Sequence, residues 1–335
     1  MEYKTPLNYK SKLDLIQTEI AIKKIKDNFE INISKSLDLL RVSAPLFVRN
    51  DSGINDDLNG IERPVTFDIK NIDYDVSVVQ SLAKWKRVAL KRYSIAKNHG
   101  IYTDMNAIRR DEDLDNLHSV YVDQWDWEYV IDKSERKLST LKKIAKKVYK
   151  SILKTQNKIT KEFPELTAYF EKDLYFIDSS KLEELYKEYD AKERENLICR
   201  EYGSVFIYKI GGKLKSGNPP HDLRAPDYDD WKLNGDILVY YPPLECAVEI
   251  SSMGIRVDEK ALKKQLKITK CESRIDMPFH KLLLNGELPY TIGGGIGQSR
   301  LCLVLLNKVH IGEVQTSIWD KETLETSKKR KIALL

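Results

Sequence analysis

IRRDEDLDNLHSVYVDQWDWE, residues 108–128, places two arginines and a short acidic cluster directly before a strand-like run. In that run, β-branched and aromatic residues are interleaved with Asp123, Gln124 and Asp126. Arginine is the residue that grips phosphate or carboxylate groups through two hydrogen bonds at once. We therefore expect this stretch to build a polar pocket on one stiff element.

A second stretch, TIGGGIGQSRLCLVLL at residues 291–306, has four glycines within five residues, then Arg300 and an apolar helical run. Glycines allow a backbone to approach a flat or phosphorylated ligand closely. The same glycines also fit a plain tight turn from a strand to a helix. A dinucleotide-binding loop is disfavoured, because no βαβ unit with an acid about 20 residues further on follows.

The composition describes a globular protein of one large domain or two, with 335 residues, 41% hydrophobic and 32% charged. Its 56 basic and 51 acidic residues give a net charge of +5, a mixed surface rather than a nucleic-acid footprint. We find no signal peptide and no apolar run of membrane-spanning length. No nucleic acid or membrane partner is therefore expected.

The cysteines and histidines carry no metal or disulfide pattern. None of the four cysteines belongs to a C-x-x-C pair, which is typical of reduced thiols in a cytoplasmic protein. The five histidines lack metal-ligand spacing, so we do not expect a structural zinc site.

Strands and helices occur in blocks. Helical periodicity covers residues 12–40 and 133–161. A strand is predicted from Val120, followed by helices to about residue 195. Further strands are predicted near residue 47 and near residues 65–69, 76–79, 206–212, 236–241 and 247–257. This order predicts an α+β fold with an antiparallel sheet flanked by helices. The glycine strand and its helix should end the fold, leaving the basic residues 328–331 in a frayed tail.

The longest predicted loop, residues 213–235, contains two consecutive prolines and several glycine or asparagine breakers. Arg224, Asp227, Asp229 and Asp230 lie on it. Loops of this length in compact domains are often functional. We interpret it as a lid or substrate wall, and a solvated surface loop is the alternative.

Three stretches resemble, in the right order, the signature motifs of class II aminoacyl-tRNA synthetases. Residues 108–128 resemble the second motif of the aspartyl and asparaginyl enzymes: an arginine, Arg109 or Arg110, an acidic cluster, and a strand ending Q-x-D-x-E. The glycine stretch with Arg300 resembles the third motif. LLRVSAPLF at residues 39–47, with Pro45, resembles the first.

QSLAKWKR at residues 80–87 resembles the segment with which aspartyl-tRNA synthetases bind the aspartate side chain through a lysine. Lys86 is the matching lysine, whereas Leu82 and Ala83 depart from the pattern. A solvated basic turn of residues 84–87 is the alternative.

The whole chain resembles the ammonia-dependent asparagine synthetases, which are class II-like enzymes. QSLAKWKR, LHSVYVDQWDWE, RAPDYDDW, LNGDILV, ISSMGIRVD, TIGGGIGQSRL and HIGEVQ fit that family. We expect one catalytic domain over residues 1–335, because no room for an anticodon-binding barrel precedes Pro45 and no glutaminase domain is present. Glu2 also stands where glutamine-dependent synthetases need a cysteine.

This resemblance implies an aspartate–ammonia ligase that converts L-aspartate, ammonia and ATP to L-asparagine, AMP and pyrophosphate through a β-aspartyl-adenylate, with Mg²⁺. A truncated tRNA synthetase paralogue that activates an amino acid for another acceptor is the alternative, and a non-catalytic scaffold is a third reading. The first motif of class II folds builds a two-fold interface, so the resemblance also implies a homodimer.

For the nucleotide, the resemblance assigns Asp236 and Glu249 to Mg²⁺, although Glu249 could instead pair with Arg256. Arg109 would hold the α-phosphate. Arg300 would lie over adenine and reach the γ-phosphate. The remaining nucleotide contacts are assigned to Ser252 and Gly295.

For aspartate, the β-carboxylate must face the α-phosphate, so Lys86 would hold the α-carboxylate. The other predicted substrate contacts are Asp56 (or its neighbour Asp57), Ser81, Gln124 and Arg224. A carboxylate near the β-carbonyl could attract ammonium and remove its proton. Asp126 and Asp229 are the candidates, and either could instead orient an arginine.

Overall fold

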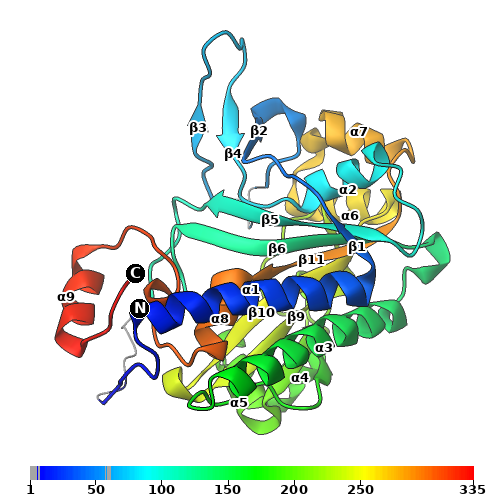
Figure 1. Cartoon of the computed structure of the whole chain (residues 1–335). Helices are drawn as coiled ribbons and strands as arrows, with labels where there is room; N and C mark the ends of the chain where they lie inside the picture. Colours follow the sequence, from blue (N-terminus) through cyan, green and yellow to red (C-terminus); the bar gives the residue numbers. More distant parts are fainter. Residues whose placement is uncertain (1–5, 7, 57, 59–61) are drawn as a thin grey trace.

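The computed structural model describes residue 6, residues 8–56, residue 58 and residues 62–335. Its centre is an eight-stranded sheet in the order β1-β5-β6-β11-β10-β9-β8-β7 (Figure 1). The outer pairs β1–β5 and β7–β8 are parallel, and the pairs between them are antiparallel. The strands are β1 (Leu39–Arg41), β5 (Gly100–Ile108), β6 (Tyr121–Val130), β7 (Tyr175–Asp178), β8 (Ser204–Tyr208), β9 (Asp229–Tyr241), β10 (Cys246–Arg256) and β11 (Thr291–Gly297).

A three-stranded sheet in the order β2-β4-β3 projects from the β5 side of the molecule (Figure 1). It consists of β2 (Phe47–Arg49), β3 (Thr66–Phe67) and β4 (Val76–Val78). The predicted strands at these places are confirmed, but β3 is shorter than predicted.

Two long helices, α1 (Leu15–Leu37) and α3 (Leu138–Glu162), pack side by side over one face of the main sheet (Figure 1). Helix α1 begins at a capping box formed by Asp14 and Gln17 and ends at Asp38, whose φ is 51°. Its buried residues recur every three or four positions, which explains the predicted helix. They are Thr18, Ala21, Ile22, Ile25, Phe29, Ile33 and Leu37.

Strand β6, which lies within the stretch of residues 108–128, has two different faces. Trp125 and Trp127 of β6 are fully buried in the core under α1, and the rings of Trp125 and Phe29 are 4.5 Å apart. Side chains alternate across a strand, so Gln124, Asp126 and Glu128 point to the opposite face. The sheet therefore uses one face for its main core and the other for polar groups.

Helices cover this opposite face only at its two ends. Near β7–β9 lie α4 (Ser179–Leu185) and α5 (Ala191–Tyr202), and near β5–β6 lies α2 (Ala83–Arg92). Helices α6 (Glu259–Thr269) and α7 (Pro278–Leu284) form a small core of their own. The middle of the face is left open for ligands.

The predicted α+β class is confirmed, but two details of the prediction are wrong. Strand β7 lies in the region predicted to be wholly helical, where four residues are too few to give a clear periodicity. Helix α8 (Gln298–Leu305) is followed by a further helix, α9 (Lys321–Arg330), that contains most of the basic cluster. The end of the chain is docked, because the N–H of Leu335 donates to the carbonyl of Gly312 at 2.8 Å.

In the part of the chain that the structure describes, no helix combines the length and apolarity needed to cross a bilayer.

Candidate active site

A cavity of about 370 Å³ opens over the polar face of the central strands. The loop predicted to form a lid or wall contributes to it, and it ends earlier than predicted because β9 begins at Asp229. The predicted site residues that line the cavity are Ser81, Lys86, Arg109, Gln124, Asp126, Arg224, Asp229, Glu249, Ser252, Gly295 and Arg300. The fold thus brings most of the predicted site together.

The glycines of β11 give space to side chains of β6. A Cβ atom on Gly293 would lie 1.9 Å from Glu128 Oε2, and one on Gly295 would lie 2.3 Å from Gln124 Oε1. On the other face, a Cβ on Gly294 would lie 2.6 Å from the carbonyl oxygen of Ser252. The glycines are therefore needed for packing within the protein, besides the predicted approach to a ligand.

We expect Gly295→Ala to raise the KM for aspartate and to lower stability by about 1–3 kcal/mol, the usual cost of overpacking. The added methyl group would displace Gln124 and would lie 3.0 Å from Asp126 Oδ1. Steady-state kinetics and urea unfolding measure both effects. Gly212→Ala is the control, because its Cβ would only reach ordinary contact at 3.9 Å from Trp231. Equal effects in the two variants would contradict this account.

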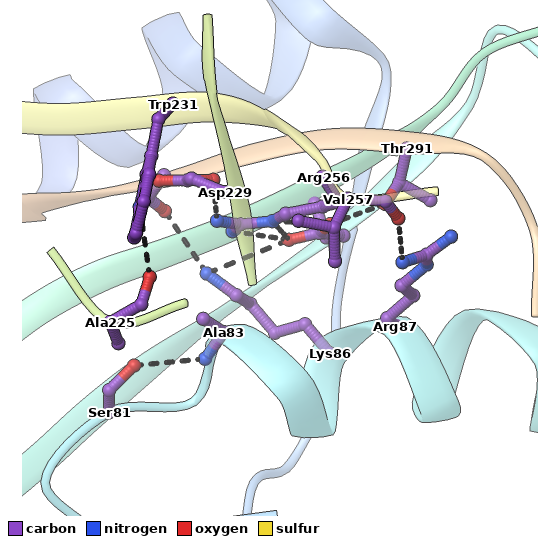
Figure 2. A network of polar contacts seen from close by, with 12 residues as sticks. Ser81, Ala83, Lys86, Arg87, Ala225, Asp229, Trp231, Arg256, Val257 and Thr291 are labelled. Atoms are coloured by element: carbon purple, nitrogen blue, oxygen red, sulfur yellow. Dashed lines mark hydrogen bonds and ion pairs between the residues drawn. The ribbon is translucent and has the colours of Figure 1, made fainter. Parts of the chain in front are cut away.

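Lys86 is buried and points from α2 toward the polar cluster around Arg256 and Asp229 (Figure 2). Its Nζ donates to Asp126 Oδ1 at 2.8 Å and to the carbonyl of Gly294 at 3.2 Å. Burial lowers the pKa of Lys86, although Asp126 and Glu128 oppose this effect. Since the neighbouring Lys84 and Arg87 are also buried, the alternative of a solvated basic turn is wrong.

Arg256 is the centre of a buried ion-pair network (Figure 2). Its Nη1 donates to Asp229 Oδ1 at 2.6 Å, and its Nε and Nη2 donate to Glu128 at 2.9 and 2.7 Å. Burial would raise the pKa of Glu128, but Arg256 and Lys86 hold it below its ordinary value. The alternative pairing of Arg256 with Glu249 is wrong.

The two candidate bases for ammonia differ in their surroundings. Asp229 forms an ion pair with Arg256 and so orients an arginine, which is the alternative role considered for Asp229. Burial raises the pKa of Asp229. Asp126 binds Lys86 rather than an arginine, through Oδ1 alone. Its Oδ2 is buried and has no hydrogen-bond partner among the described residues. Asp126 therefore retains an acceptor atom at the cavity.

Asp236 lies beside the cavity rather than in its lining. It forms an ion pair with Arg224 of the loop and lies opposite Ser252 in the β9–β10 register. Burial raises the pKa of Asp236 well above its ordinary value, and Glu249 adds to the rise. Its Oδ1 is buried without a hydrogen-bond partner in the described chain.

These two carboxylates fit Mg²⁺, which is bound through one or two carboxylates together with phosphate oxygens and water. Asp236 Oδ1 supplies a buried oxygen without a partner among the described residues, and Glu249 lines the cavity nearby. Within residues 6, 8–56, 58 and 62–335, no three His, Cys, Asp or Glu side chains cluster closely enough to hold a metal alone.

Two arginines approach the cavity from different elements. Arg109 follows β5, and its Nη1 lies 3.8 Å from Glu112 Oε2, too far for a hydrogen bond. Its Nε is buried with no partner in the described parts of the chain. Arg300 of α8 donates from Nη1 to the carbonyl oxygen of Glu249 at 3.2 Å. Both guanidinium groups can bind phosphate.

Asp56 is buried outside the cavity lining, and its carbonyl oxygen accepts a hydrogen bond from Gln80 at 2.7 Å. Its charge acts on Tyr228, which does line the cavity. The alternative, Asp57, lies outside the described residues. Sequence reasoning missed Tyr228 although RAPDYDDW contains it, and it also missed the cavity residue Gln315 in HIGEVQ.

The comparison with known families decides the identity of this site. The family model described as aspartate-ammonia ligase matches residues 16–331. The chain belongs to the aspartate–ammonia ligase family. An aspartate–ammonia ligase of Clostridium perfringens is 58% identical over 331 residues, which cover 98% of both chains. That of Pediococcus pentosaceus is 51% identical over 336 residues and covers 100% of both. The predicted family and enzyme class are therefore confirmed.

Solved structures show the fold that this aspartate–ammonia ligase shares with class II synthetases. The asparaginyl-tRNA synthetase of Pyrococcus horikoshii with asparaginyl-adenylate has a TM-score of 0.64 at 14% identity, over 89% of this chain and 68% of that one. An aspartyl-tRNA synthetase of Entamoeba histolytica has a TM-score of 0.59 at 16% identity, over 91% and 59% of the two chains. The predicted class II-like fold is confirmed.

Proposed function

We propose that this ligase forms L-asparagine from L-aspartate, ammonia and ATP through a β-aspartyl-adenylate, with release of AMP and pyrophosphate. The supporting observation is one cavity that contains Arg109 and Arg300 beside the buried lysine–carboxylate cluster of Lys86. A carboxylate is a poor electrophile. Its attack on the α-phosphate of ATP forms an acyl-adenylate, in which AMP is a good leaving group. The cavity is therefore suited to bring the two substrates together.

The nucleotide occupies the arginine side of the cavity. Arg109 holds the α-phosphate and stabilises the charge that develops on it during attack by the aspartate carboxylate. Arg300 lies over adenine and reaches the γ-phosphate, and Ser252 and Gly295 complete the nucleotide contacts.

Asp236 and Glu249 would hold the metal. Mg²⁺ held there would supply positive charge to stabilise the phosphate oxygens.

Aspartate binds with its β-carboxylate toward the α-phosphate, because the amide forms on the side chain. Lys86 then holds the α-carboxylate, and Gln124 contacts the amino acid or its adenylate. Ser81 and Arg224 line the same cavity and add polar contacts. The buried Asp56 is the candidate for the amino group.

We expect Lys86→Ala to raise the KM for aspartate about tenfold to a hundredfold, the loss of one charge-assisted hydrogen bond. The KM for ATP should change less. Lys91→Ala is the control, because Lys91 lies on the same helix and is an exposed lysine paired with Glu287. An unchanged KM for aspartate in Lys86→Ala would remove Lys86 from this role.

The activity itself is tested by mixing the purified protein with ATP, Mg²⁺ and aspartate, with and without ammonium chloride. Asparagine that forms in step with AMP, and only with ammonium, supports the proposal. ATP–pyrophosphate exchange with aspartate but no asparagine would favour a synthetase paralogue with another acceptor.

We also propose that the chain is a single catalytic domain that works as a homodimer. An apolar stripe on the outer side of α1 supports the dimer: Ile16, Ile20 and Ile31 are 71, 48 and 63% exposed. Leu40 and Leu46, on either side of the first-motif proline segment, are also exposed. Exposed apolar groups in such a stripe are typical of an interaction site.

We expect Ile31→Glu to convert the dimer into monomers of 38.9 kDa, because it would place a charge in the interface. Size-exclusion chromatography with light scattering measures the mass. Ile268→Glu is the control, since Ile268 is 56% exposed but lies on α6. A wild-type mass of one chain would contradict the proposed dimer.

A further inference from the structure

Helix α5 packs beside strand β10, which carries the cavity residue Glu249. The Oδ1 atom of Asn196 on α5 accepts a hydrogen bond from the backbone N–H of Ala247 on β10 at 2.8 Å. Lys192 lies one helical turn before Asn196, on the same side of α5. Glu249 follows Ala247 by two residues on β10, so both are on the same face of the strand. The contact between Asn196 and Ala247 therefore sets Lys192 near Glu249.

Lys192 is part of a row of polar side chains that leads from α5 to the loop of the cavity wall. Its Nζ lies 2.9 Å from Glu195 Oε2, and Glu195 Oε1 lies 3.1 Å from His221 Nε2. The His221 side chain is only 1% exposed, whereas that of Lys192 is 64% exposed. His221 thus anchors Glu195, and the lysine at the end of the row remains accessible to a ligand.

The electrostatic surroundings place Lys192 with the groups proposed for the nucleotide. Desolvation by the surrounding protein acts to lower the pKa of Lys192, even though its side chain is 64% exposed, but Glu195 and Glu249 together hold the pKa above its ordinary value, and Arg300 acts against them. The charges of Glu249 and Arg300 therefore both act on the Lys192 ammonium group. In the mechanism above, these residues hold the metal and the γ-phosphate, and Lys192 has no role.

We infer that Lys192 binds the terminal phosphate of ATP, and the pyrophosphate formed from it, at the rim of the cavity. Lysine acts as a mobile point charge for phosphate oxygens. Glu195 and His221 are positioning residues that keep the ammonium group at the rim before ATP enters. The inference rests on the proposed function, because that function places the phosphates beside Arg300 and Glu249.

The test compares Lys192→Ala and Lys192→Arg with the wild-type enzyme. We expect Lys192→Ala to raise the KM for ATP and the inhibition constant for pyrophosphate about tenfold, the loss of one charge-assisted hydrogen bond. The KM for aspartate and the affinity for AMP, which lacks the terminal phosphates, should remain within about twofold. Lys192→Arg should recover most of the affinity for ATP, since it keeps the positive charge.

Lys181→Ala is a matched control. Lys181 on α4 is 61% exposed and pairs with Glu184 three residues later at 3.0 Å, as Lys192 pairs with Glu195. Lys181→Ala should leave the KM for ATP, the KM for aspartate, the inhibition constant for pyrophosphate and the affinity for AMP unchanged. The inference is overturned if Lys192→Ala binds ATP and pyrophosphate as tightly as the wild type, or if it weakens AMP binding equally.

Isothermal titration of the full chain with ATP, pyrophosphate or AMP in the presence of Mg²⁺ separates this inference from the proposed function. If the wild type binds ATP and pyrophosphate but makes no asparagine, the proposed function fails, and the titration of Lys192→Ala still decides the role of Lys192. If the wild type binds neither ligand, both fail.

Discussion

Asp126→Asn should abolish amide formation while leaving adenylate formation largely intact. We expect asparagine synthesis to fall by about 10²–10⁴, the usual contribution of a positioned general base. The asparagine side chain can still accept the hydrogen bond that Lys86 donates to Asp126 Oδ1 at 2.8 Å. What it loses is the negative charge and the basic Oδ2 atom, the one with no partner among the described residues. Asparagine formation and ATP–pyrophosphate exchange, measured on the same preparation, separate the two steps.

Asp229→Asn is the comparison, because Asp229 is the other candidate and already binds Arg256 at 2.6 Å. We expect it to reduce both steps together, since it disturbs the network rather than a free acceptor. Asp126 would be removed as the base if pyrophosphate exchange collapsed in Asp126→Asn as well. It would also be removed if Asp229→Asn alone kept exchange and lost asparagine formation.

Arg256→Ala should be among the most destabilising single substitutions in this chain. It would leave Glu128 and Asp229, which are 0 and 2% exposed, without their shared cation. Breaking a buried ion pair by removing one partner costs about 3–5 kcal/mol, because an uncompensated charge remains in the interior. The free energy of unfolding from urea titration measures the loss.

Arg49→Ala is the control for this experiment. Arg49 pairs with Asp51 at 2.5 Å, but the two side chains are 51 and 65% exposed. Water screens exposed ion pairs, so they contribute little to stability, and we expect only a small loss of stability. If Arg256→Ala were as stable as Arg49→Ala, the network would not hold the site together.

The sequence predicted those parts of the fold that depend on neighbours along the chain. The apolar spacing of α1 and the alternation on β6 follow from local geometry, and both were recognised. The short edge strand β7 was missed because it is stabilised by pairing with β8 rather than by a local pattern. Helix α9 was missed although it carries a local signal, the N-cap residue Asp320, whose side chain accepts a hydrogen bond from the N–H of Thr323.

The same distinction holds for the site. Lys86, Gln124 and Arg300 were found because they lie in motifs. The partners of the charged groups could not be predicted, since Arg256 reaches back 128 positions to Glu128. Lys84, read as part of a solvated turn, pairs with the buried Asp227 143 positions away. Such pairings are decided by the order of strands and loops in space.

The two faces of β6 also restrict how the length of this enzyme can change. A shift of one residue along a strand moves every side chain to the opposite face. One residue inserted in β6 before Trp125 would turn Trp125 and Trp127 toward the cavity. The same shift would turn Asp126 and Glu128 into the apolar core. Insertions and deletions are therefore tolerated only outside this strand, and its number of residues is as constrained as their identity.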